Sequence, residues 1–389
     1  MYTPVRPTDD GSTRRCFLLS AGHRPEAGTP ERMTRVAVLH DGTVNPGGAV
    51  DVVTRAATVL DADLYVGYSG VERDWWLDRV PDDVRVLTGR ETQSTVTDAR
   101  VALAFLRLSL DEYDVVLSSG PGTKFYQPSD DQRVVHYLHH PPLAALWFDG
   151  SPLDYLVTVV DRIETWTIPT VIANSELTAD RMETHYNRRP DAVVNPPVDV
   201  ARFRTDRERR ADEVVMVGRL EERKRPLLAV EAFRRLHDRR DDGQDPPRLR
   251  LLGDGPLREQ VEGEAPPNVT VEGYVDDGAL VDAVERASTG LFLARREDFG
   301  VTPVEYMAAG TPVVGVDEPN TNDQVTAEET GVLVAPEPDA VADGVRRALG
   351  RDWDRDRIRE DATAYGLAAF DEGIREVVGA DVDTDTVGE

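Results

Sequence analysis

The sequence predicts two α/β domains, each built on a doubly wound parallel sheet. Short apolar segments alternate with helix-patterned segments along the chain, and the alternation restarts after a proline-rich crossing, Asn195–Asp199. Neither proline of this crossing can sit inside a helix, so we place the domain boundary there. The length, 389 residues, suits two domains of ordinary size.

Four segments follow from this organisation. Residues 1–32 read as a disordered leader or a mis-assigned start, because Met33 immediately precedes a good strand. Residues 33–198 form the first domain and residues 199–352 the second. Residues 353–389 form C-terminal helices that could pack back on the first domain, followed by an acidic tail.

The expected strands of the first domain are short, apolar and rich in β-branched residues. They are Arg35–His40, Leu64–Tyr68, Val84–Leu87, Val115–Ser118, Arg133–Leu138 and Val171–Ala173. Helical periodicity is expected from about Ala49 to Leu60, over Ala99–Leu110 and Pro152–Trp166, and after Ser175, which suits an N-cap.

The second domain repeats the pattern. Its expected strands are Glu213–Val217, Leu249–Leu252, Val269–Glu272, Gly290–Ala294, Thr311–Gly315 and Gly331–Val334. Helices are expected up to about Arg240, after Gly253–Pro256, over Gly278–Arg286, around Val304–Ala308, over Asp339–Leu349 and between Asp354 and Val378. Pro303 fits a first helical turn, and Gly310 fits a helix stop.

The excess of acidic over basic residues suggests that the protein works at high salt concentration. The net charge is −27, and only Lys124 and Lys224 are lysines. A dispersed acidic excess with almost no lysine suggests adaptation to high salt, where the Debye length shrinks to about 3 Å at 1 M. Nucleic acid is an unfavourable partner, because phosphate backbones require a basic stripe.

Cysteine use and hydropathy fit a cytoplasmic protein. The single cysteine, Cys16, cannot form an intrachain disulfide, and its apolar neighbours are too few for a convincing signal peptide. No run of 18 apolar residues exists, so we expect no transmembrane helix. The segment Pro142–Leu156 could touch a membrane surface, and burial within the first domain is the alternative.

Two carboxylates, Glu297 and Glu305, fall in one strand–loop–helix–strand unit. Ligands of open α/β sheets bind at such loops. The spacing alone is weak, because two acids at this separation are common on solvated helices. The apolar neighbours of Glu305 strengthen the signal, since a carboxylate is expensive to bury unless it accepts hydrogen bonds.

A basic loop follows the first strand of the second domain. Arg219 and Lys224 could point into the same cleft as the carboxylates, where a guanidinium fork and an ammonium suit a diphosphate leaving group. We expect Arg223 and Arg225 to be plain surface charge.

Glycines and histidines mark the first domain. Gly47 and Gly48, at a strand-to-helix turn, let backbone N–H groups approach an anion, although a plain tight turn explains them equally well. His139 and His140 end a strand and are well placed for a ligand. Adjacent histidines in a strand point to opposite faces, and no carboxylate with ligand spacing lies nearby, so we expect no metal.

Over about residues 34–370, the sequence resembles the retaining GT-B glycosyltransferases of family four (glycosyl transferases group 1). Each motif is weak alone, and the set in this order is specific. The motifs are GGA (Gly47–Ala49), H-x-P (His139–Pro141), ANSE (Ala173–Glu176), NPPVD…F (Asn195–Phe203), VGRL…K (Val217–Lys224), GDGP (Gly253–Pro256), GYV (Gly273–Val275) and E…FG…PVE (Glu297–Glu305).

The resemblance implies a GT-B fold, with two Rossmann-like domains facing across a cleft. The first would be the acceptor-side domain and the second would bind a nucleotide sugar. Family enzymes generally act without an essential metal, and the resemblance implies no cofactor. We see no obvious nucleophile in the sequence.

The resemblance also implies roles for individual residues. His139, Glu297, Arg219 and Lys224 would be catalytic: Glu297 beside the donor sugar, His139 reaching it from the first domain, and the two cations holding the diphosphate. Glu305 would accept hydrogen bonds from the ribose hydroxyls.

Backbone groups would complete the donor site. Phe299, Gly300 and Val301 would present backbone to the sugar or phosphate, and Gly47 and Gly48 would approach the phosphate or the acceptor. The turn made of Gly273, Tyr274 and Val275 would face the base.

Three departures from the family pattern put the donor's identity in doubt. Val50 stands where many relatives have an acid, and Tyr306 where alanine is usual. After Gly315 the expected pair of glycines is missing, and the chain reads EPNTNDQV over Glu318–Val325.

The function implied is transfer of a hexose, with mannose as one option, from a GDP- or UDP-linked sugar to a glycan or lipid-linked acceptor, with retention. A peripheral contact with the cytoplasmic membrane face would suit a lipid-linked acceptor. The alternatives are a sugar-nucleotide epimerase or phosphorylase-like enzyme of similar fold, and a non-catalytic nucleotide-sugar-binding protein. The sequence leaves open the base, sugar, linkage, acceptor, oligomeric state and true N-terminus.

Overall fold

The structure, a computed structural model, describes most of the chain from residue 34 onward. The described ranges are 34–43, 47–80, 84–89, 94–140, 152–206, 208, 212–239 and 245–379, without the side chains of 95 and 152–158. The expected leader and acidic tail lie outside these ranges, as does the first part of the segment expected to touch a membrane. Both sheets belong to one compact unit, Thr34–Glu389.

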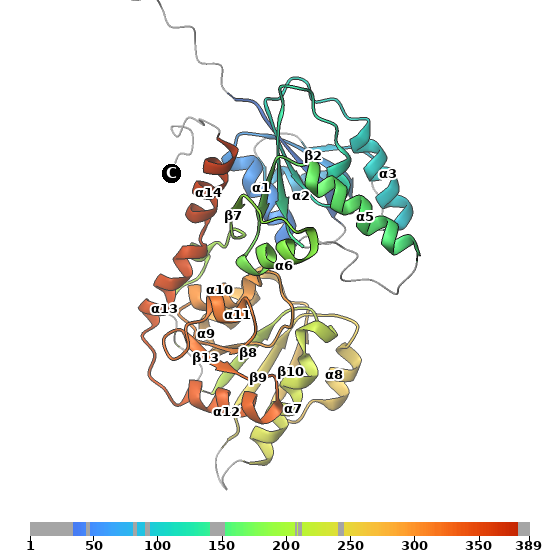
Figure 1. Ribbon diagram of the computed structural model, residues 1–389. Helices are drawn as coiled ribbons and strands as arrows, with labels where there is room; N and C mark the ends of the chain where they lie inside the picture. Colours follow the sequence, from blue (N-terminus) through green and yellow to red (C-terminus); the bar gives the residue numbers. More distant parts are fainter. Residues whose placement is uncertain are drawn as a thin grey trace, which may run out of the picture. The chain divides into compact units, whose positions relative to one another are not determined.

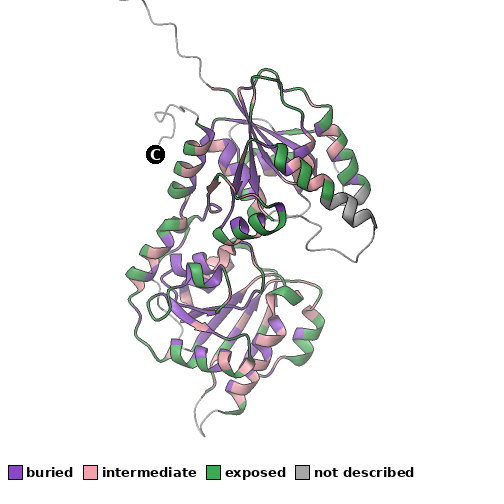
Figure 2. Ribbon diagram, in the orientation of Figure 1, coloured by how far each residue is buried: buried purple, intermediate pink, exposed green. Residues whose placement is uncertain are grey.

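The first sheet has seven parallel strands in the order β3-β2-β1-β4-β5-β6-β7. They are β1 (Val36–Thr43), β2 (Asp63–Ser69), β3 (Val84–Val86), β4 (Val115–Ser119), β5 (Arg133–Leu138), β6 (Thr170–Ala173) and β7 (Ala192–Val193). The central strands are apolar and buried on both faces, as parallel sheets covered by helices require (Figure 2). The order reverses between β1 and β4.

Helices cover both faces of this sheet (Figure 1). They are α1 (Gly48–Val59), α2 (Arg73–Leu77), α3 (Thr95–Leu106), α5 (Pro152–Thr167), α6 (Glu176–Tyr186) and the short 3-10 turn η1 (Gly122–Phe125). One buried cluster joins α1 and α2 to one face, and a second joins α3 and α6 to the other.

The second sheet has six parallel strands in the order β10-β9-β8-β11-β12-β13. They are β8 (Glu213–Val217), β9 (Arg248–Leu252), β10 (Val269–Gly273), β11 (Thr289–Phe292), β12 (Val313–Val316) and β13 (Gly331–Val334). Counted from β8, this is the 3-2-1-4-5-6 order of doubly wound nucleotide-binding sheets, with its reversal between β8 and β11.

The helices of the second half are α7 (Pro226–Asp238), α8 (Arg258–Glu264), α9 (Asp277–Arg286), α10 (Val301–Ala308), α11 (Thr321–Gln324), α12 (Pro338–Leu349) and α13 (Arg355–Ala362). Three 3-10 turns are η2 (Val200–Arg202), η3 (Glu222–Lys224) and η4 (Thr363–Tyr365). The prediction of two doubly wound parallel sheets is confirmed.

The last described helix, α14 (Leu367–Val378), packs on the first sheet. Phe370 packs near Tyr137 of β5, with ring centroids 6.4 Å apart. Arg55 of α1 pairs with Asp371, and Arg133 Nη1 donates to the carbonyl of Val378 at 3.0 Å. Apolar and ionic contacts therefore both fasten this helix to the first half of the chain.

Most predicted elements are found within a few residues, and the exceptions have local causes. The predicted helix Ala99–Leu110 instead runs from Thr95 to Leu106, because Ser94 caps it by accepting from the Thr97 N–H at 3.1 Å. Helix α2 was not predicted, since five residues give too little periodicity. Ser175 is the N-cap of α6, as predicted.

The departure at Tyr306 is accommodated by a glycine on the neighbouring strand. Tyr306 is fully buried, and its hydroxyl accepts a hydrogen bond from the Val217 N–H of β8 at 2.8 Å. A Cβ atom placed on Gly290 of β11 would lie 2.2 Å from the Tyr306 ring. The missing side chain at 290 is therefore what admits the large ring at 306.

Gly290→Ala should destabilise the protein by about 1–3 kcal/mol, because the added methyl group must displace a buried ring and its hydrogen bond. Gly263→Ala is the matched control: no atom lies within 4 Å of its added Cβ, and alanine favours helix α8. Denaturant unfolding should give opposite signs for the two variants, and equal losses would contradict this packing.

Candidate functional site

The candidate site forms where the second sheet reverses its strand order. The loop Gly218–Arg225 follows β8, and the loop 293–300 follows the neighbouring strand β11. Connections leave these two strands in opposite directions, which opens a crevice at their carboxyl ends. The two loops are tied together, because the Arg295 N–H donates to the Arg223 carbonyl at 2.8 Å.

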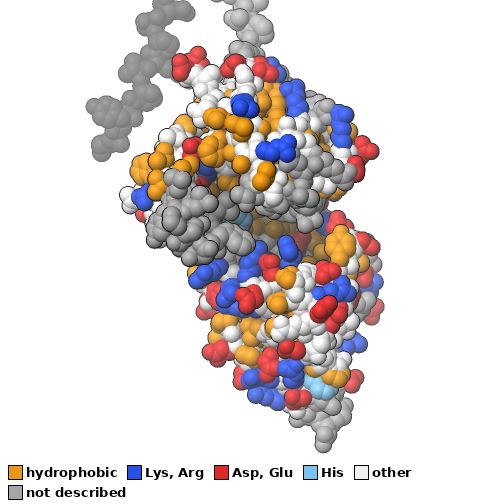
Figure 3. Space-filling model, turned by 90° about the vertical axis from the view of Figure 1, so that its right-hand side faces the viewer, with side chains coloured by type: hydrophobic (Ala, Val, Ile, Leu, Met, Phe, Trp, Pro, Cys, Tyr) orange, Lys and Arg blue, Asp and Glu red, His pale blue; other side chains and the backbone are white. Residues whose placement is uncertain are grey.

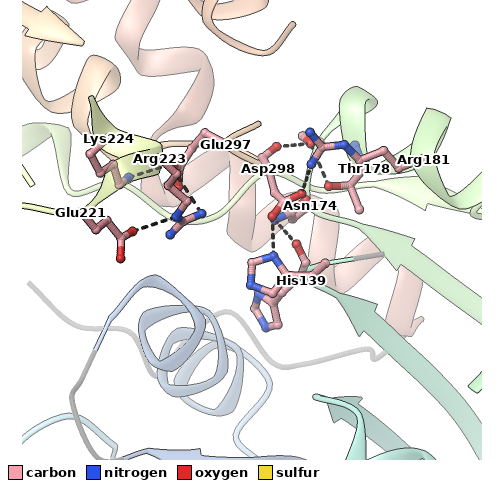
Figure 4. A network of polar contacts seen from close by, with 11 residues as sticks. His139, Asn174, Thr178, Arg181, Glu221, Arg223, Lys224, Glu297 and Asp298 are labelled. Atoms are coloured by element: carbon pink, nitrogen blue, oxygen red, sulfur yellow. Dashed lines mark hydrogen bonds and ion pairs between the residues drawn. The ribbon is translucent and has the colours of Figure 1, made fainter. Parts of the chain in front are cut away.

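An ion pair joins the two loops (Figure 4). Lys224 Nζ lies 2.6 Å from Glu297 Oε2, and the two side chains are only 17% and 16% exposed. An ammonium carries three donors, so Lys224 can hold this carboxylate and still donate to a phosphate oxygen. The structure thus brings together two of the residues predicted to be catalytic.

The expectation of plain surface charge is wrong for Arg225, whose side chain is only 20% exposed, whereas Arg223 is 46% exposed but is also held by carboxylates. Arg223 Nη1 lies 3.8 Å from Glu297, and its Nε donates to Glu221 at 2.8 Å. Arg225 donates to Glu318 at 2.7 Å and to the Leu293 carbonyl at 3.1 Å. The cause is the 3-10 turn η3, which folds the loop over the end of β11 instead of extending it into water.

Arg219, by contrast, is not drawn into the ion cluster. Its side chain is 69% exposed, and the nearest carboxylate is that of Glu221, at 3.9 Å. It lies on the same loop as Lys224 and is free to move toward a ligand. The structure therefore supplies Lys224 and Arg223 as held cations and Arg219 as an exposed one.

Two amide side chains fix the turn Phe299–Val301. Gln324 Nε2 donates to the Phe299 carbonyl at 2.8 Å and to the Gly300 carbonyl at 3.2 Å, and Asn320 also donates to the Phe299 carbonyl. In a trans peptide the N–H points away from the C=O. With the carbonyls of Phe299 and Gly300 held by Asn320 and Gln324, the N–H groups of Gly300 and Val301 therefore point away from these two amide side chains. Asn320 and Gln324 belong to the segment that departs from the family pattern, and sequence reasoning gave them no role.

Glu305 lies one helical turn further along α10. No hydrogen bond or ion pair to its carboxylate is found among the described residues. Burial raises the pKa of Glu305 to about 7, with Arg202 opposing the shift and Asp51 and Asp277 adding to it. A desolvated carboxyl without a protein donor is suited to accept from ligand hydroxyls.

His139 is held at the carboxyl end of β5. Its Nε2 lies 2.7 Å from the Ser119 hydroxyl, and its carbonyl accepts from Asn174 Nδ2 at 3.0 Å. Burial and the neighbouring His40 and His140 lower the pKa of His139 well below its ordinary value, so the ring is neutral. If Ser119 donates to Nε2, the ring proton lies on Nδ1, and His139 offers a ligand a neutral N–H donor.

The predicted backbone contacts come from three strand ends. A Cβ on Gly48 would lie 3.7 Å from Cγ2 of Val301, which places the start of α1 against the start of α10, while nothing lies within 4 Å of a Cβ on Gly47. Gly273 ends β10 with φ +74°, and the next side chain, Tyr274, is 82% exposed. Gly273, Tyr274 and Val275 share no described hydrogen bond with Glu297 or Lys224.

Sequence reasoning missed Asp298 altogether, although it lies between two motif residues. Its carboxylate is buried and accepts from His140 and Arg181, both from the first half of the chain. The sequence places His140 and Arg181 near strand ends, which suggests that they could bind a carboxylate. It does not indicate which carboxylate they would contact.

The described residues contain no group of three or more His, Cys, Asp or Glu side chains close enough to hold a metal ion. Nor do they include a helix long and apolar enough to span a membrane. On the face in Figure 3, acidic and basic side chains are interspersed rather than gathered by sign.

Comparison with known proteins finds a family match in the second half of the chain. Residues 199–365 match the family "Glycosyl transferases group 1". The chain is 27% identical over 221 residues to a D-inositol 3-phosphate glycosyltransferase of Jonesia denitrificans, covering 50% of this chain and 52% of that one. It is 24% identical over 271 residues to the alpha-1,3/1,6-mannosyltransferase ALG2 of Mus musculus, covering 61% and 65%. The matches thus span about half to two thirds of these relatives.

Two solved structures show the fold. Anabaena HepE in complex with UDP and glucose has a TM-score of 0.69 at 16% identity, covering 90% of this chain and 100% of that one. The lipopolysaccharide outer core galactosyltransferase WaaB has a TM-score of 0.65 at 15% identity, covering 89% and 99%. The fold is GT-B, and the resemblance to glycosyl transferases group 1 is confirmed.

Glu305→Gln should raise the melting temperature more at pH 8 than at pH 5, by about 2–4 °C. The pKa of Glu305 is about 7 in the folded protein and lies near 4.5 when unfolded, so the folded state binds more protons between these values. Stability therefore falls as pH rises through this window, and Gln removes that loss.

Glu259→Gln, on the exposed face of α8, is the control and should show a pH-independent difference. Melting curves from pH 5 to pH 8 measure both variants. A Glu305→Gln difference that does not change with pH would refute the burial of an unpaired carboxyl.

Proposed function

We propose that the protein is a retaining glycosyltransferase that moves a hexose from a nucleoside diphosphate sugar to a glycan or lipid-linked acceptor. One observation carries the proposal: Lys224 and Glu297 form a shielded ion pair at the switch point of the second sheet. Glu305, a carboxyl without a described partner, lies on the helix that leaves the same crevice.

The donor would fill this crevice in three parts. Glu305 would accept from the ribose hydroxyls, while Lys224, Arg219 and Arg223 would face the diphosphate. The N-terminus of α10 would contribute backbone N–H groups from the turn that Gln324 holds. The base would lie against Gly273, Tyr274 and Val275.

Departure of the diphosphate is the step that these residues would assist. Cleavage of the bond between the sugar and the phosphate oxygen places negative charge on the leaving group, and cations fixed beforehand stabilise that charge. Glu297 holds Lys224 in place and would lie beside the sugar. His139 would donate a hydrogen bond to the sugar from the first half.

Mannose is the sugar we favour, because several relatives carry mannosyltransferase names. One is the mouse ALG2 protein, and another is a GDP-mannose-dependent mannosyltransferase of Mycobacterium tuberculosis, 29% identical over 140 residues. GDP-mannose is therefore the first donor to try, followed by UDP-linked hexoses.

A thermal-shift screen of GDP-, UDP- and ADP-sugars in molar salt tests the donor assignment. We expect one nucleotide class to raise the melting temperature in a concentration-dependent way, as a ligand that binds only the folded state must. No shift with any of the three, in a protein that melts cooperatively, would count against the proposal.

A sugar-nucleotide epimerase is the second candidate function, and analysis of the products distinguishes it from a glycosyltransferase. A donor incubated without acceptor would return an altered nucleotide sugar from an epimerase, and only slow hydrolysis from a transferase. A non-catalytic binding protein would shift in the thermal screen and yield neither product.

Lys224→Ala should reduce donor turnover by at least about 100-fold, because it removes a leaving-group cation and strands the Glu297 carboxylate. Arg223→Ala should cost about 10-fold, since Arg223 lies 3.8 Å from the same carboxylate. Arg239→Ala, a half-exposed arginine on the far end of α7, is the control and should change turnover less than twofold.

Steady-state kinetics with the donor from the screen measures all three variants. Equal effects at Arg223, Lys224 and Arg239 would contradict the assignment.

The proposal also includes activity in molar salt and peripheral contact with a membrane that carries a lipid-linked acceptor. The net charge of −27 supports folding and activity in molar salt, where repulsion between carboxylates is screened. Flotation with liposomes at high salt tests peripheral membrane contact. Absence of co-flotation, together with transfer to a soluble acceptor, would reject the lipid-linked acceptor.

A further inference from the structure

The described hydrogen bonds and ion pairs of Asp298 all lead to the first half of the chain. Its carboxylate accepts from His140 and from the Arg181 guanidinium, and its backbone carbonyl accepts from the Ser175 hydroxyl. Asp298 itself lies in the loop after β11, in the second half. Its side chain is only 8% exposed, so this is a desolvated carboxylate whose hydrogen-bond partners come from the first half.

The three donors come from neighbouring strand ends. His140 follows β5, whereas Ser175 caps the helix after β6 and Arg181 lies on that helix, α6. The strand ends are braced, because Asn174 Nδ2 donates to the His139 carbonyl and Asn195 Nδ2 donates to the Asn174 carbonyl, both at 3.0 Å. The donors to Asp298 are therefore held in place by hydrogen bonds between neighbouring strand ends.

Asp298 directly follows Glu297, and the two carboxylates point in different directions (Figure 4). Glu297 faces Lys224 and Asp298 faces Arg181. Holding Asp298 restrains the backbone of Glu297, because a rigid, planar peptide unit joins the two residues. The contact between the halves therefore holds the loop that carries the Glu297 carboxylate.

We propose that Asp298 is a positioning residue, which locks the Glu297 loop in its working geometry when the two halves meet through His140, Ser175 and Arg181. The inference rests on the proposed function for its kinetic consequence. Because the Asp298 carboxylate is engaged by His140 and Arg181, its effect on the donor would be transmitted through Glu297. A donor seated against Glu297 and the contact at Asp298 should favour the same arrangement.

The kinetic test uses Asp298→Asn, which keeps the shape and removes the charge. We expect kcat to fall about 10- to 100-fold, while the affinity for the free nucleoside diphosphate changes less than threefold. Arg181→Ala should match it, and the double variant should be no worse than either single one, because both break one contact. Arg181→Lys, which keeps a cation, should recover part of the loss.

The matched control is Arg189→Ala, which removes a half-exposed arginine just after α6 that pairs with carboxylates of that helix only. It should leave kcat unchanged. A merely structural Asp298 would lower the melting temperature and leave kcat per folded enzyme intact, and that result would overturn the proposal, as would fully additive losses at residues 181 and 298.

Hydrogen exchange tests the contact without any activity. Asp298→Ala should speed amide exchange at least about threefold both in 294–301 and in 175–181, because one contact orders both segments. Faster exchange in 294–301 alone would show that the contact does not join the halves, and this readout stands even if no sugar donor is ever turned over.

Discussion

A carboxylate that leaves water costs free energy unless a cation or a hydrogen-bond donor compensates it, and the three carboxylates on this loop and helix meet that constraint in different ways. Glu297 is compensated by Lys224 of the loop after β8, and Asp298 by Arg181 and His140 of the first half. Glu305 has no described partner, and its pKa rises accordingly to about 7. Burying a charge without a partner is costly, which is why the proposed function assigns the ligand hydroxyls to the carboxyl of Glu305.

The loop that carries these carboxylates is supported by groups that touch no carboxylate. Gln324 donates to the carbonyls of Phe299 and Gly300. At the other end of α10, the Arg359 guanidinium donates to the carbonyls of Ala308, Phe203 and Val200. Helix ends leave unpaired carbonyls, so a guanidinium there fixes the end of α10 to the chain crossing. The site is therefore held at both ends of a helix only eight residues long.

The sequence was most informative where one local pattern decides the structure. Buried parallel strands read as short apolar runs, and Ser175 read as a helix cap, because in both cases the determining groups are near in sequence. The family resemblance placed Lys224 and Glu297 at one site, but their ion pair was not predicted. The contacts of Arg223 could not be predicted, because the 3-10 turn η3 directs this side chain toward the neighbouring loop. A turn of three residues leaves no periodic signal in the sequence. The partner of Asp298 lies more than 100 residues away, and no local rule finds it.

The departures from the family pattern gain a physical reading from the structure. Tyr306 replaces a small residue, and the space that it needs is supplied by Gly290 on the adjacent strand. The segment that lacks the expected glycines supplies Asn320 and Gln324, which hold the very turn whose N–H groups would face a donor. The side-chain amides of Asn320 and Gln324 occupy part of the space that glycines would leave open, so the proposed donor would approach over the backbone of Phe299–Val301. This same turn begins directly after Asp298. If a bound donor favours the arrangement in which Asp298 contacts Arg181, that contact must strengthen donor binding by the same factor, because coupling between two equilibria is reciprocal.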